Sequence, residues 1–317
     1  MKIKDKRISI IGFGSQGKSW AQNLTDSGFN VKVALRAGSY SIGKASELGF
    51  DVTNLRTAFV NSDIICMLTP DETHAEIIGK YAQEMDRGQS IVFAHGFNIH
   101  YGTVKIHENA NVILVSPKGT GKALRELFLK GSGVPSMIAV ERDVTNESWD
   151  IANDIAVSLG SGKMDIMKST FREETEINLF SEQAFFLSAL PEIIRETYQI
   201  LCEAGYSPKA SYYETLHKLG IMSELLQKNG LYEYYEKVSS VARLGGMLSK
   251  GRIITDSSIK EMKKILKEIQ DRTFLKRLNE EIGSKNKNYK NYLSEIMESD
   301  LEKTGKLIRE KAFRNEY

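Results

Sequence analysis

The chain has 317 residues, of which 41% are hydrophobic and 26% are charged, and it is long enough for two ordinary domains. Its 43 Lys and Arg side chains nearly balance 41 Asp and Glu side chains, and no stretch combines basic charge with interleaved aromatics, which argues against a nucleic-acid partner. The start MKIKDKRISIIGFG contains no leader, and no window approaches about 18 apolar residues, so we expect a cytoplasmic protein with no membrane partner.

Short β-rich runs alternate with helix-like segments from Arg7 to about Glu141. The runs are RISIIG, NVKVAL, DIICML, SIVFAH, NVILVSP and SMIAVE, and the segments between them include SWAQNLTDSG and THAEIIGKYAQEM. Strands and helices in alternation indicate a parallel sheet that is covered on both faces. We therefore predict an α/β fold, a doubly wound Rossmann domain, over residues 1–168.

Helical apolar spacing dominates after about Lys168, from INLFSEQAFFLSALPEIIRETYQILCEAG through KEMKKILKEIQDRTFLKRL. This pattern predicts an all-α second domain over residues 169–317. Within it, the Lys- and Asn-rich piece SKNKNYKNY is predicted to be a solvated loop, because charge-rich stretches without an apolar period rarely pack. The two cysteines, Cys66 and Cys202, fall in different predicted domains and are expected to be reduced core residues.

A glycine-rich turn follows the first predicted strand in RISIIGFGSQG. Gly12, Gly14 and Gly17 stand between a strand and a helix, where glycines permit a tight turn, close approach of a pyrophosphate and tight helix packing. This context predicts a dinucleotide site, and a plain glycine-rich turn is the alternative.

The residues after the second predicted strand favour NADPH over NADH. An NAD site wants a carboxylate there for the ribose 2′-hydroxyl, whereas this chain has LRAGSYS. Arg36 neutralises charge and stacks on adenine, and Ser39 and Ser41 donate hydrogen bonds, which suits a 2′-phosphate.

The segments LTPDETH and FAHGFNIH follow two further predicted strands, at the carboxyl ends where open α/β sheets bind ligands. His95 in the second segment is a candidate catalytic residue. Its alternative role is to cap backbone groups at the end of the strand.

Together these motifs resemble the ketol-acid reductoisomerase family, short-chain class, over nearly the whole chain. The resemblance is carried by GFGSQG, LRAGS, LTPDE, FAHGFNIH, SPKGTG, GVPSMIAV, EETEINLFSEQ, YYETLH and RIITD. It implies a Rossmann domain followed by a knotted α-helical domain that intertwines in a homodimer or higher homo-oligomer. It also implies a two-step reaction on a small-molecule substrate, namely Mg²⁺-dependent alkyl migration of 2-acetolactate and then reduction by NADPH.

The resemblance implies roles for individual residues. His95 and Lys118 should face the substrate, and Ser239 matches the serine that holds the substrate carboxylate. The residues that the resemblance and the turn chemistry together assign to the cofactor are Gly12, Phe13, Gly14, Ser15, Gln16, Gly17, Arg36, Ser39, Ser41, Asp71, Glu72, Thr73, His74 and Gly121.

The metal positions depart from the family pattern. The family holds two Mg²⁺ with an Asp and a Glu four apart on one helix and two Glu four apart on another. Here the first pair is Asn178 and Glu182, and the second is Glu214 and Lys218. Glu182 and Glu214 contribute −1 each and Lys218 contributes +1, so the formal charge is −1. Since Mg²⁺ requires hard oxygen ligands, we expect no metal, with Glu182 and Glu214 as the residual candidate ligands.

Other substrate-side positions also differ from the family. The family's SNTAEYG appears as SSVARLG, which places Arg243 where the family has a glutamate. Lys218 and Arg243 together provide a clamp for a substrate carboxylate. The other interpretation of Lys218 is a salt bridge to Glu214 on the same helix, although we expect a family metal position to be buried.

Three functions follow from this comparison. The first is an NADPH-dependent reductase of a 2-keto acid, or of a related ketone or imine, without the migration step, in which Lys218 replaces the metal and Glu182 and Glu214 donate protons or orient the substrate. The second is an authentic ketol-acid reductoisomerase that works with one Mg²⁺ held by Glu182, Glu214 and Asn178. The third is a non-catalytic NADPH-binding protein.

Overall fold

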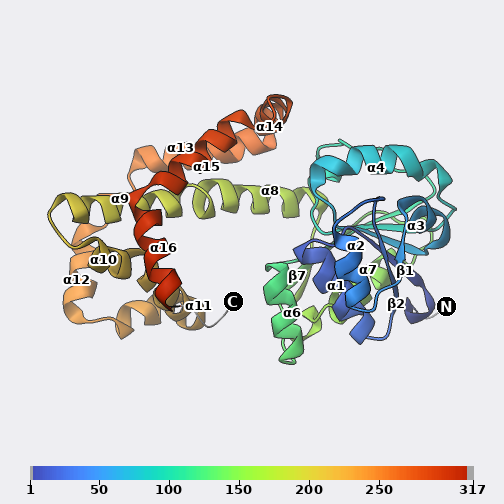
Figure 1. The fold of residues 1–317 in the computed structure, drawn as a ribbon, viewed down its shortest axis with the longest axis horizontal. Coiled ribbons are helices and arrows are strands. Elements are labelled where there is room, and N and C mark those ends of the chain that lie inside the picture. The colour runs from blue at the N-terminus through green and yellow to red at the C-terminus, as the bar shows by residue number, and fades with distance from the viewer. Residues whose placement is uncertain (1–2, 313–317) are drawn as a thin grey trace. The chain divides into compact units, whose positions relative to one another are not determined.

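A computed structural model describes residues 3–312 of the chain. The chain divides into two compact units, Met1–Ile177 and Asn178–Tyr317, and the division falls within helix α8 (Phe171–Ser181). Figure 1 shows the strands gathered in the first unit and helices alone in the second. The α/β first domain and the helical second domain are therefore as predicted.

The first unit is built on one eight-stranded sheet in the order β3-β2-β1-β4-β5-β6-β7-β8. All neighbouring strands are parallel except β6 and β7, which are antiparallel. The six predicted strands are present, and the sequence reasoning missed the two short edge strands β3 and β8. The strands are β1 (Arg7–Ile11), β2 (Asn30–Ala34), β3 (Val52–Thr53), β4 (Ile64–Met67), β5 (Ser90–Phe93), β6 (Asn111–Pro117), β7 (Ser136–Arg142) and β8 (Ile166–Lys168).

Helices cover both faces of this sheet because its strands are apolar on both sides. Along β1, Ile8 and Ile10 pack into one core cluster with α1, α6 and α7, while Ile11 packs into another with α3 and α4. Buried parallel strands have this two-sided apolar character. The helices of the unit before α8 are α1 (Ser15–Asp26), α2 (Ser41–Glu47), α3 (Leu55–Asn61), α4 (His74–Tyr81), α5 (Phe97–His100), α6 (Gly121–Leu129) and α7 (Ser148–Ser158), with short 3₁₀ turns at Ile3–Asp5, Asp71–Thr73, Ala82–Glu84 and Ser161–Lys163.

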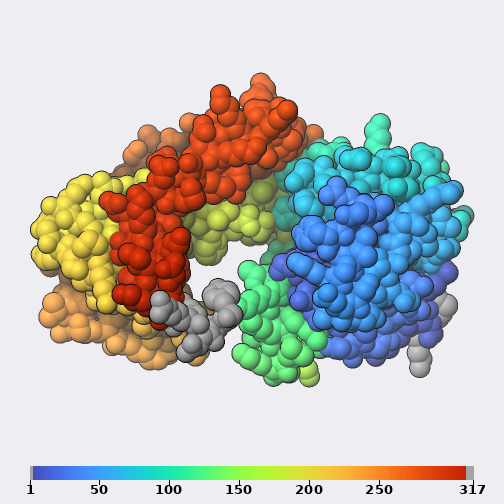
Figure 2. Space-filling view, viewed as in Figure 1, coloured from blue at the N-terminus to red at the C-terminus, as the bar shows by residue number. Residues whose placement is uncertain are grey.

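The second unit is entirely helical in its described part. Its small core is formed by Tyr198, Tyr212 and Ile308, which come from α9, α10 and α16. Figure 2 shows α16, in red, directly against the yellow segment that contains α9 and α10. The helices are α9 (Ala189–Glu203), α10 (Pro208–Tyr212), α11 (Lys218–Lys237), α12 (Ser240–Ser249), α13 (Asp256–Gln270), α14 (Thr273–Gly283), α15 (Lys287–Glu298) and α16 (Asp300–Ala312), with π-helical turns at Glu182–Phe186 and Tyr213–His217.

The prediction that SKNKNYKNY forms a loop is wrong for most of its length. Lys285 and Asn286 form a left-handed turn with φ values of 59° and 58°, and α15 begins at the next residue. The helix forms because Tyr289 and Tyr292 begin an apolar stripe that continues downstream at helical spacing. The backbone N–H of Tyr289 also donates to the Glu281 carboxylate, at 3.0 Å, which ties the first turn down.

Helices α11 and α12 contain no buried residue in the single chain. Leu231, Val241 and Leu248 on these helices are 70%, 82% and 74% exposed. A helix gains most of its stability in a protein by packing an apolar face against other residues. The exposed apolar side chains of α11 and α12 have no such packing in the single chain. Among residues 3–312, no helix has the length and apolar character needed to cross a bilayer.

Candidate active site

The glycine-rich turn between β1 and α1 has the geometry of a phosphate cradle. Gly12 has φ 98°, and a Cβ atom there would lie 2.8 Å from the Leu68 carbonyl oxygen. A Cβ at Gly17 would lie 2.3 Å from the Gly12 oxygen, so both positions require glycine. A Cβ at Gly14, in contrast, meets nothing within 4 Å. Gly14 thus faces open space at the amino end of α1, where a pyrophosphate needs close access to backbone N–H groups.

Two further predicted cofactor residues hold this turn against helix α6. The Gln16 amide donates to the Gly119 carbonyl oxygen at 2.9 Å. Gly121 is buried, and a Cβ there would lie 2.2 Å from the Ser15 oxygen, so glycine is needed for the approach of α6 to α1. These contacts make the turn rigid, while direct contact of either residue with the cofactor stays a prediction.

A cavity of about 400 Å³ lies beside the turn and is lined by Phe13, Gly14, Ser15 and Ser41 among others. The Ser41 backbone N–H donates to the Ser39 hydroxyl at 3.3 Å, which fixes the loop after β2. Arg36 is exposed on the same loop but does not line the cavity. The cradle suits a pyrophosphate and the cavity lies beside it, so the residues present are compatible with NADPH.

The second cluster of the first unit lies at the carboxyl ends of its strands. The Lys118 ammonium lies 2.7 Å from the carboxylate of Glu174, which also accepts hydrogen bonds from the Ser116 hydroxyl and the Gly96 N–H, each at 2.8 Å. Glu174 is fully buried. Burial raises the pKa of its carboxyl group, but His95, Lys118 and these hydrogen bonds together bring that pKa below the usual 4.5.

His95 lies between two carboxylates. Its Nδ1 atom is 3.7 Å from Asp71 and its Nε2 atom is 3.9 Å from Glu174. Both ring nitrogens are buried without a hydrogen-bond partner among residues 3–312. Buried polar groups usually have a partner, so these two nitrogens are available to a bound molecule. The ring also stacks on Phe97, with centroids 6.3 Å apart, which fixes its plane.

The neighbouring residues of the LTPDETH segment form a supporting network. His74 is almost fully buried, with Nε2 2.9 Å from the Thr69 carbonyl oxygen and Nδ1 accepting from the Asn98 amide at 3.0 Å. This pattern fits a neutral ring, and burial lowers the pKa of His74. Burial likewise raises the pKa of Asp71, against the opposing effect of the two histidines. Both ring nitrogens of His74 thus have partners in the protein, and its contact with the cofactor stays a prediction.

Glu72 and Thr73 are the other predicted cofactor residues of this segment. Glu72 is exposed, and the Thr73 hydroxyl donates to the Pro70 carbonyl oxygen at 2.7 Å. Their contacts with a cofactor stay predictions.

Glu174 is the main member of the cluster that the sequence reasoning missed. It was available in the sequence as the acid four residues before Asn178 in EETEINLFSEQ. Nothing in the spacing showed that its side chain contacts Lys118, Ser116 and Gly96 of the first unit.

The predicted metal positions lie in the second unit. The Asn178 amide donates to the Glu182 carboxylate at 3.5 Å, and the Lys218 ammonium donates to the Glu214 carboxylate at 2.7 Å. Glu182 is the first residue of one π-helical turn and Glu214 is the second residue of the other, and such turns are frequent at functional sites. The side chains of Lys218 and Glu214 are 50% and 67% exposed, so the expectation of a buried lysine is wrong for the single chain.

This donor set does not fit a pair of Mg²⁺ ions. It offers two carboxylates and one amide, with an ammonium already paired to one of the carboxylates. No group of three or more His, Cys, Asp or Glu residues within the described chain is arranged to hold a metal ion.

Of the three predicted substrate residues, Asn178 lies in α8, whereas Ser239 and Arg243 lie at the start of α12. The Ser239 hydroxyl caps the helix by accepting from the Ala242 N–H at 3.3 Å. Arg243 lies 3.0 Å from the carboxylate of Glu236. Arg243 is thus paired with Glu236, so its role in a carboxylate clamp with Lys218 stays a prediction.

Fold and site together define an oxidoreductase of the Rossmann type, with a dinucleotide cradle and a Lys–Glu–His cluster in one unit. Residues 2–165 match the acetohydroxy acid isomeroreductase NADPH-binding domain, and residues 171–313 match the ketol-acid reductoisomerase C-terminal domain. The chain belongs to the ketol-acid reductoisomerase family of NADPH-dependent oxidoreductases.

Individual relatives agree with this assignment. The chain is 41% identical over 310 residues to the ketol-acid reductoisomerase (NADP(+)) of Methanocaldococcus jannaschii, which covers 97% of this chain and 93% of the relative. It is 38% identical over 309 residues to that of Corynebacterium urealyticum, covering 97% and 92%. A solved NADH-preferring ketol-acid reductoisomerase from an uncultured archaeon has a TM-score of 0.94 and 30% identity, covering 97% of this chain and 95% of that chain.

Proposed function

We propose that the protein reduces a 2-keto acid with NADPH, the step that the first two predicted functions share. The observation that carries this proposal is the Lys118–Glu174–His95 cluster at the strand ends of the unit that also holds the dinucleotide cradle. When bound, NADPH supplies the hydride to the carbonyl carbon. The carbonyl oxygen gains negative charge in that step and needs a cation and a proton donor.

Lys118 and His95 are the groups that meet this need. Glu174 holds the Lys118 ammonium at 2.7 Å, so that cation is fixed before the substrate arrives. The buried nitrogens of His95 lack hydrogen-bond partners among the described residues, so a ring N–H is free to donate to the oxygen. The products are a 2-hydroxy acid and NADP⁺.

The complete ketol-acid reductoisomerase reaction, from 2-acetolactate to 2,3-dihydroxyisovalerate, is the version that the comparisons support better. The relatives that match 97% of this chain carry that name. Reduction without migration, which the sequence analysis favoured, is supported by one specific observation. Asn178 and Lys218 occupy two of the four metal positions of the family pattern, and the present donors do not fit two Mg²⁺ ions.

We propose that two copies of the chain form a homodimer. The exposed apolar faces of α11 and α12 support it, because single domains rarely leave such faces uncovered. Sedimentation at micromolar concentration tests this, and a monomer would contradict it. The knot and the cytoplasmic location stay predictions.

The experiment is NADPH oxidation with 3-hydroxy-3-methyl-2-oxobutyrate and, separately, with 2-acetolactate, each with Mg²⁺ and with EDTA. Turnover of acetolactate with Mg²⁺ establishes the complete reaction, whereas turnover of the keto acid alone, unaffected by EDTA, establishes reduction without migration. Lys118→Met should reduce either activity at least 100-fold. Lys122→Met is the control, because the Lys122 side chain is 83% exposed. Absence of turnover with both substrates contradicts the proposal.

A further inference from the structure

The cavity beside the glycine-rich turn contains charged residues that the cofactor prediction did not include. Lys18 from α1 and Lys44 from α2 both line it, together with Tyr40 and Glu47. The cavity also borders Ser41, the first residue of α2, just after the β2 loop where a Rossmann fold recognises the 2′ position of the adenosine ribose. It is therefore placed to receive the adenosine half of the dinucleotide.

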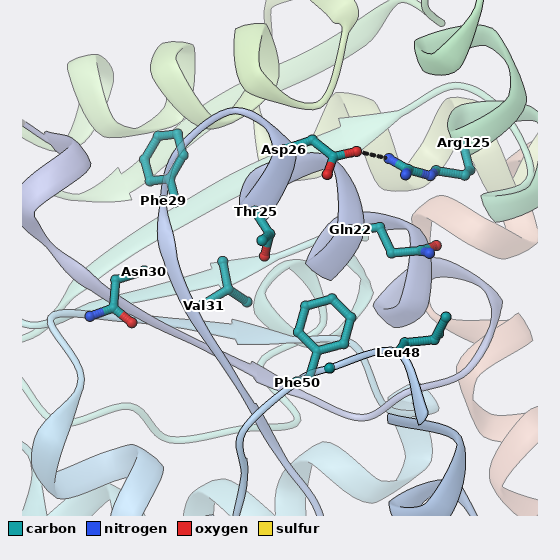
Figure 3. A pocket seen from close by; sticks show the side chains of 10 residues that line it. Gln22, Thr25, Asp26, Phe29, Asn30, Val31, Leu48, Phe50 and Arg125 are labelled. Atoms are coloured by element: carbon teal, nitrogen blue, oxygen red, sulfur yellow. Dashed lines mark hydrogen bonds and ion pairs between the residues drawn. The ribbon is translucent and has the colours of Figure 1, made fainter. Parts of the chain in front are cut away.

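Both lysines present free positive charge to this cavity. Neither ammonium forms an ion pair with a carboxylate among residues 3–312, although Glu47 lines the same space. A neighbouring cavity of about 330 Å³ differs in this respect (Figure 3). Its cation, Arg125, is already paired with Asp26 at 2.6 Å. The cavity at the glycine-rich turn thus combines unpaired cations with a nucleotide-binding turn, whereas the neighbouring cavity does not.

Lys44 is further held in place by an aromatic ring. Its ammonium lies over the ring of Tyr40, 5.2 Å from the centroid, and Tyr40 itself is 81% exposed. A cation over a ring face gains modest electrostatic attraction without losing its charge. Tyr40 thus limits the positions of the lysine side chain while leaving the ammonium able to bind an anion.

We propose that Lys44 is a specificity-determining residue that binds the 2′-phosphate of NADPH, and that Tyr40 positions it. The proposal rests on the NADPH site of the proposed function and adds to it a residue ten positions after the end of β2. A phosphate dianion needs several donors, and Ser41 and Lys44 line the same cavity. NADH has a hydroxyl in place of this phosphate, so Lys44 should contribute little to its binding.

The test is the dissociation constant for NADPH and for NADH, measured by cofactor fluorescence without substrate. Lys44→Gln should weaken NADPH binding about 10-fold, equivalent to about 1.4 kcal/mol, and change NADH binding less than 2-fold. Lys80→Gln is the matched control, because Lys80 lies 5.4 Å from the ring of Tyr81 in a different helix. Tyr40→Phe should keep the selectivity for NADPH and Tyr40→Ala should reduce it.

Equal weakening of both cofactors by Lys44→Gln would overturn the proposal, because it would place Lys44 at a phosphate that both share. The same loss of selectivity from Lys18→Gln would also overturn it, since general charge in the cavity would then be sufficient. An unmodified protein that does not prefer NADPH contradicts it too. A protein that prefers NADPH through Lys44 but reduces neither keto acid contradicts the proposed function and leaves this assignment intact.

Discussion

Replacing Glu174 by Gln tests the electrostatics of the Lys118–Glu174–His95 cluster. The amide keeps the shape of the carboxylate, and its oxygen still accepts from the Gly96 N–H or the Ser116 hydroxyl. It removes the negative charge 2.7 Å from the Lys118 ammonium. The main consequence is a partly buried cation without its counter-charge.

The expected loss of stability follows from the burial of the pair. Removing one partner of a buried ion pair reduces the free energy of unfolding by about 3–5 kcal/mol. Glu174 is fully buried, but the Lys118 side chain is 28% exposed, so water screens part of the stranded charge. We therefore expect the lower end of that range, about 3 kcal/mol, for unfolding of the first unit at pH 7.

The assay is urea unfolding followed by tryptophan fluorescence. Both tryptophans of the chain, Trp20 and Trp149, lie in the first unit, so the signal reports that unit alone. Glu173→Gln on the same helix is the control, because Glu173 is exposed and its replacement should change the free energy of unfolding by less than about 0.5 kcal/mol. If Glu174→Gln is no more destabilising than this control, the electrostatic account of the cluster is wrong.

The pH dependence provides a second check on the same variant. The pKa of Glu174 in the folded protein lies below its usual 4.5, so the carboxylate stabilises the fold at pH values above 4.5. That contribution is lost as the pH falls from 4.5 through the lowered pKa. The difference in unfolding free energy between the natural protein and Glu174→Gln should therefore shrink below pH 4.5, and a constant difference down to pH 3 would refute the assignment.

Four other variants have distinct expected outcomes. Gly17→Ala should destabilise the first unit by more than about 2 kcal/mol in urea unfolding, because its Cβ would lie 2.3 Å from a backbone oxygen. Gly14→Ala should leave the stability unchanged, because its Cβ meets nothing within 4 Å, but it should weaken NADPH binding in a fluorescence titration. Lys218→Ala should change the melting temperature by less than 2 °C, since an exposed pair contributes about 0.3–0.5 kcal/mol. Asn178→Asp combined with Lys218→Glu should tighten Mn²⁺ binding at least 10-fold in calorimetry, and an unchanged affinity would show that these positions do not hold the ion.

The sequence predicted the fold well where one residue type or period decides the structure. The strand–turn–helix context of Gly12, Gly14 and Gly17 led to the cradle that the structure shows, and the change to helical spacing after about Lys168 led to the helical second unit. The edge strands β3 and β8 have only two and three residues, too few for a period to appear. The prediction missed α15 because the Lys- and Asn-rich composition of its first turns resembles a loop, although its tyrosines have helical spacing.

The site was harder to predict because its members meet only through the fold. Lys118 and Glu174 are 56 positions apart, and the acid reaches its partners because α8 begins against the core of the first unit through Phe171. Composition and local pattern contain no information on such a contact. Likewise, Lys18 and Lys44 lie on two different helices, α1 and α2, and only the folded structure shows that both line one cavity.

The departures at the metal positions and at Arg243 fall in the second unit. The nucleotide cradle and the Lys118–Glu174–His95 cluster, to which we assign the proposed reduction, both belong to the first unit. Lys218 is paired with Glu214, but both side chains are exposed, so releasing that carboxylate requires only a few tenths of a kcal/mol. The ion pair alone therefore does not prevent Glu214 from binding a cation in the complete reaction. What the substitutions do remove is negative charge, and we expect this loss to affect the metal-dependent migration step more than the proposed reduction.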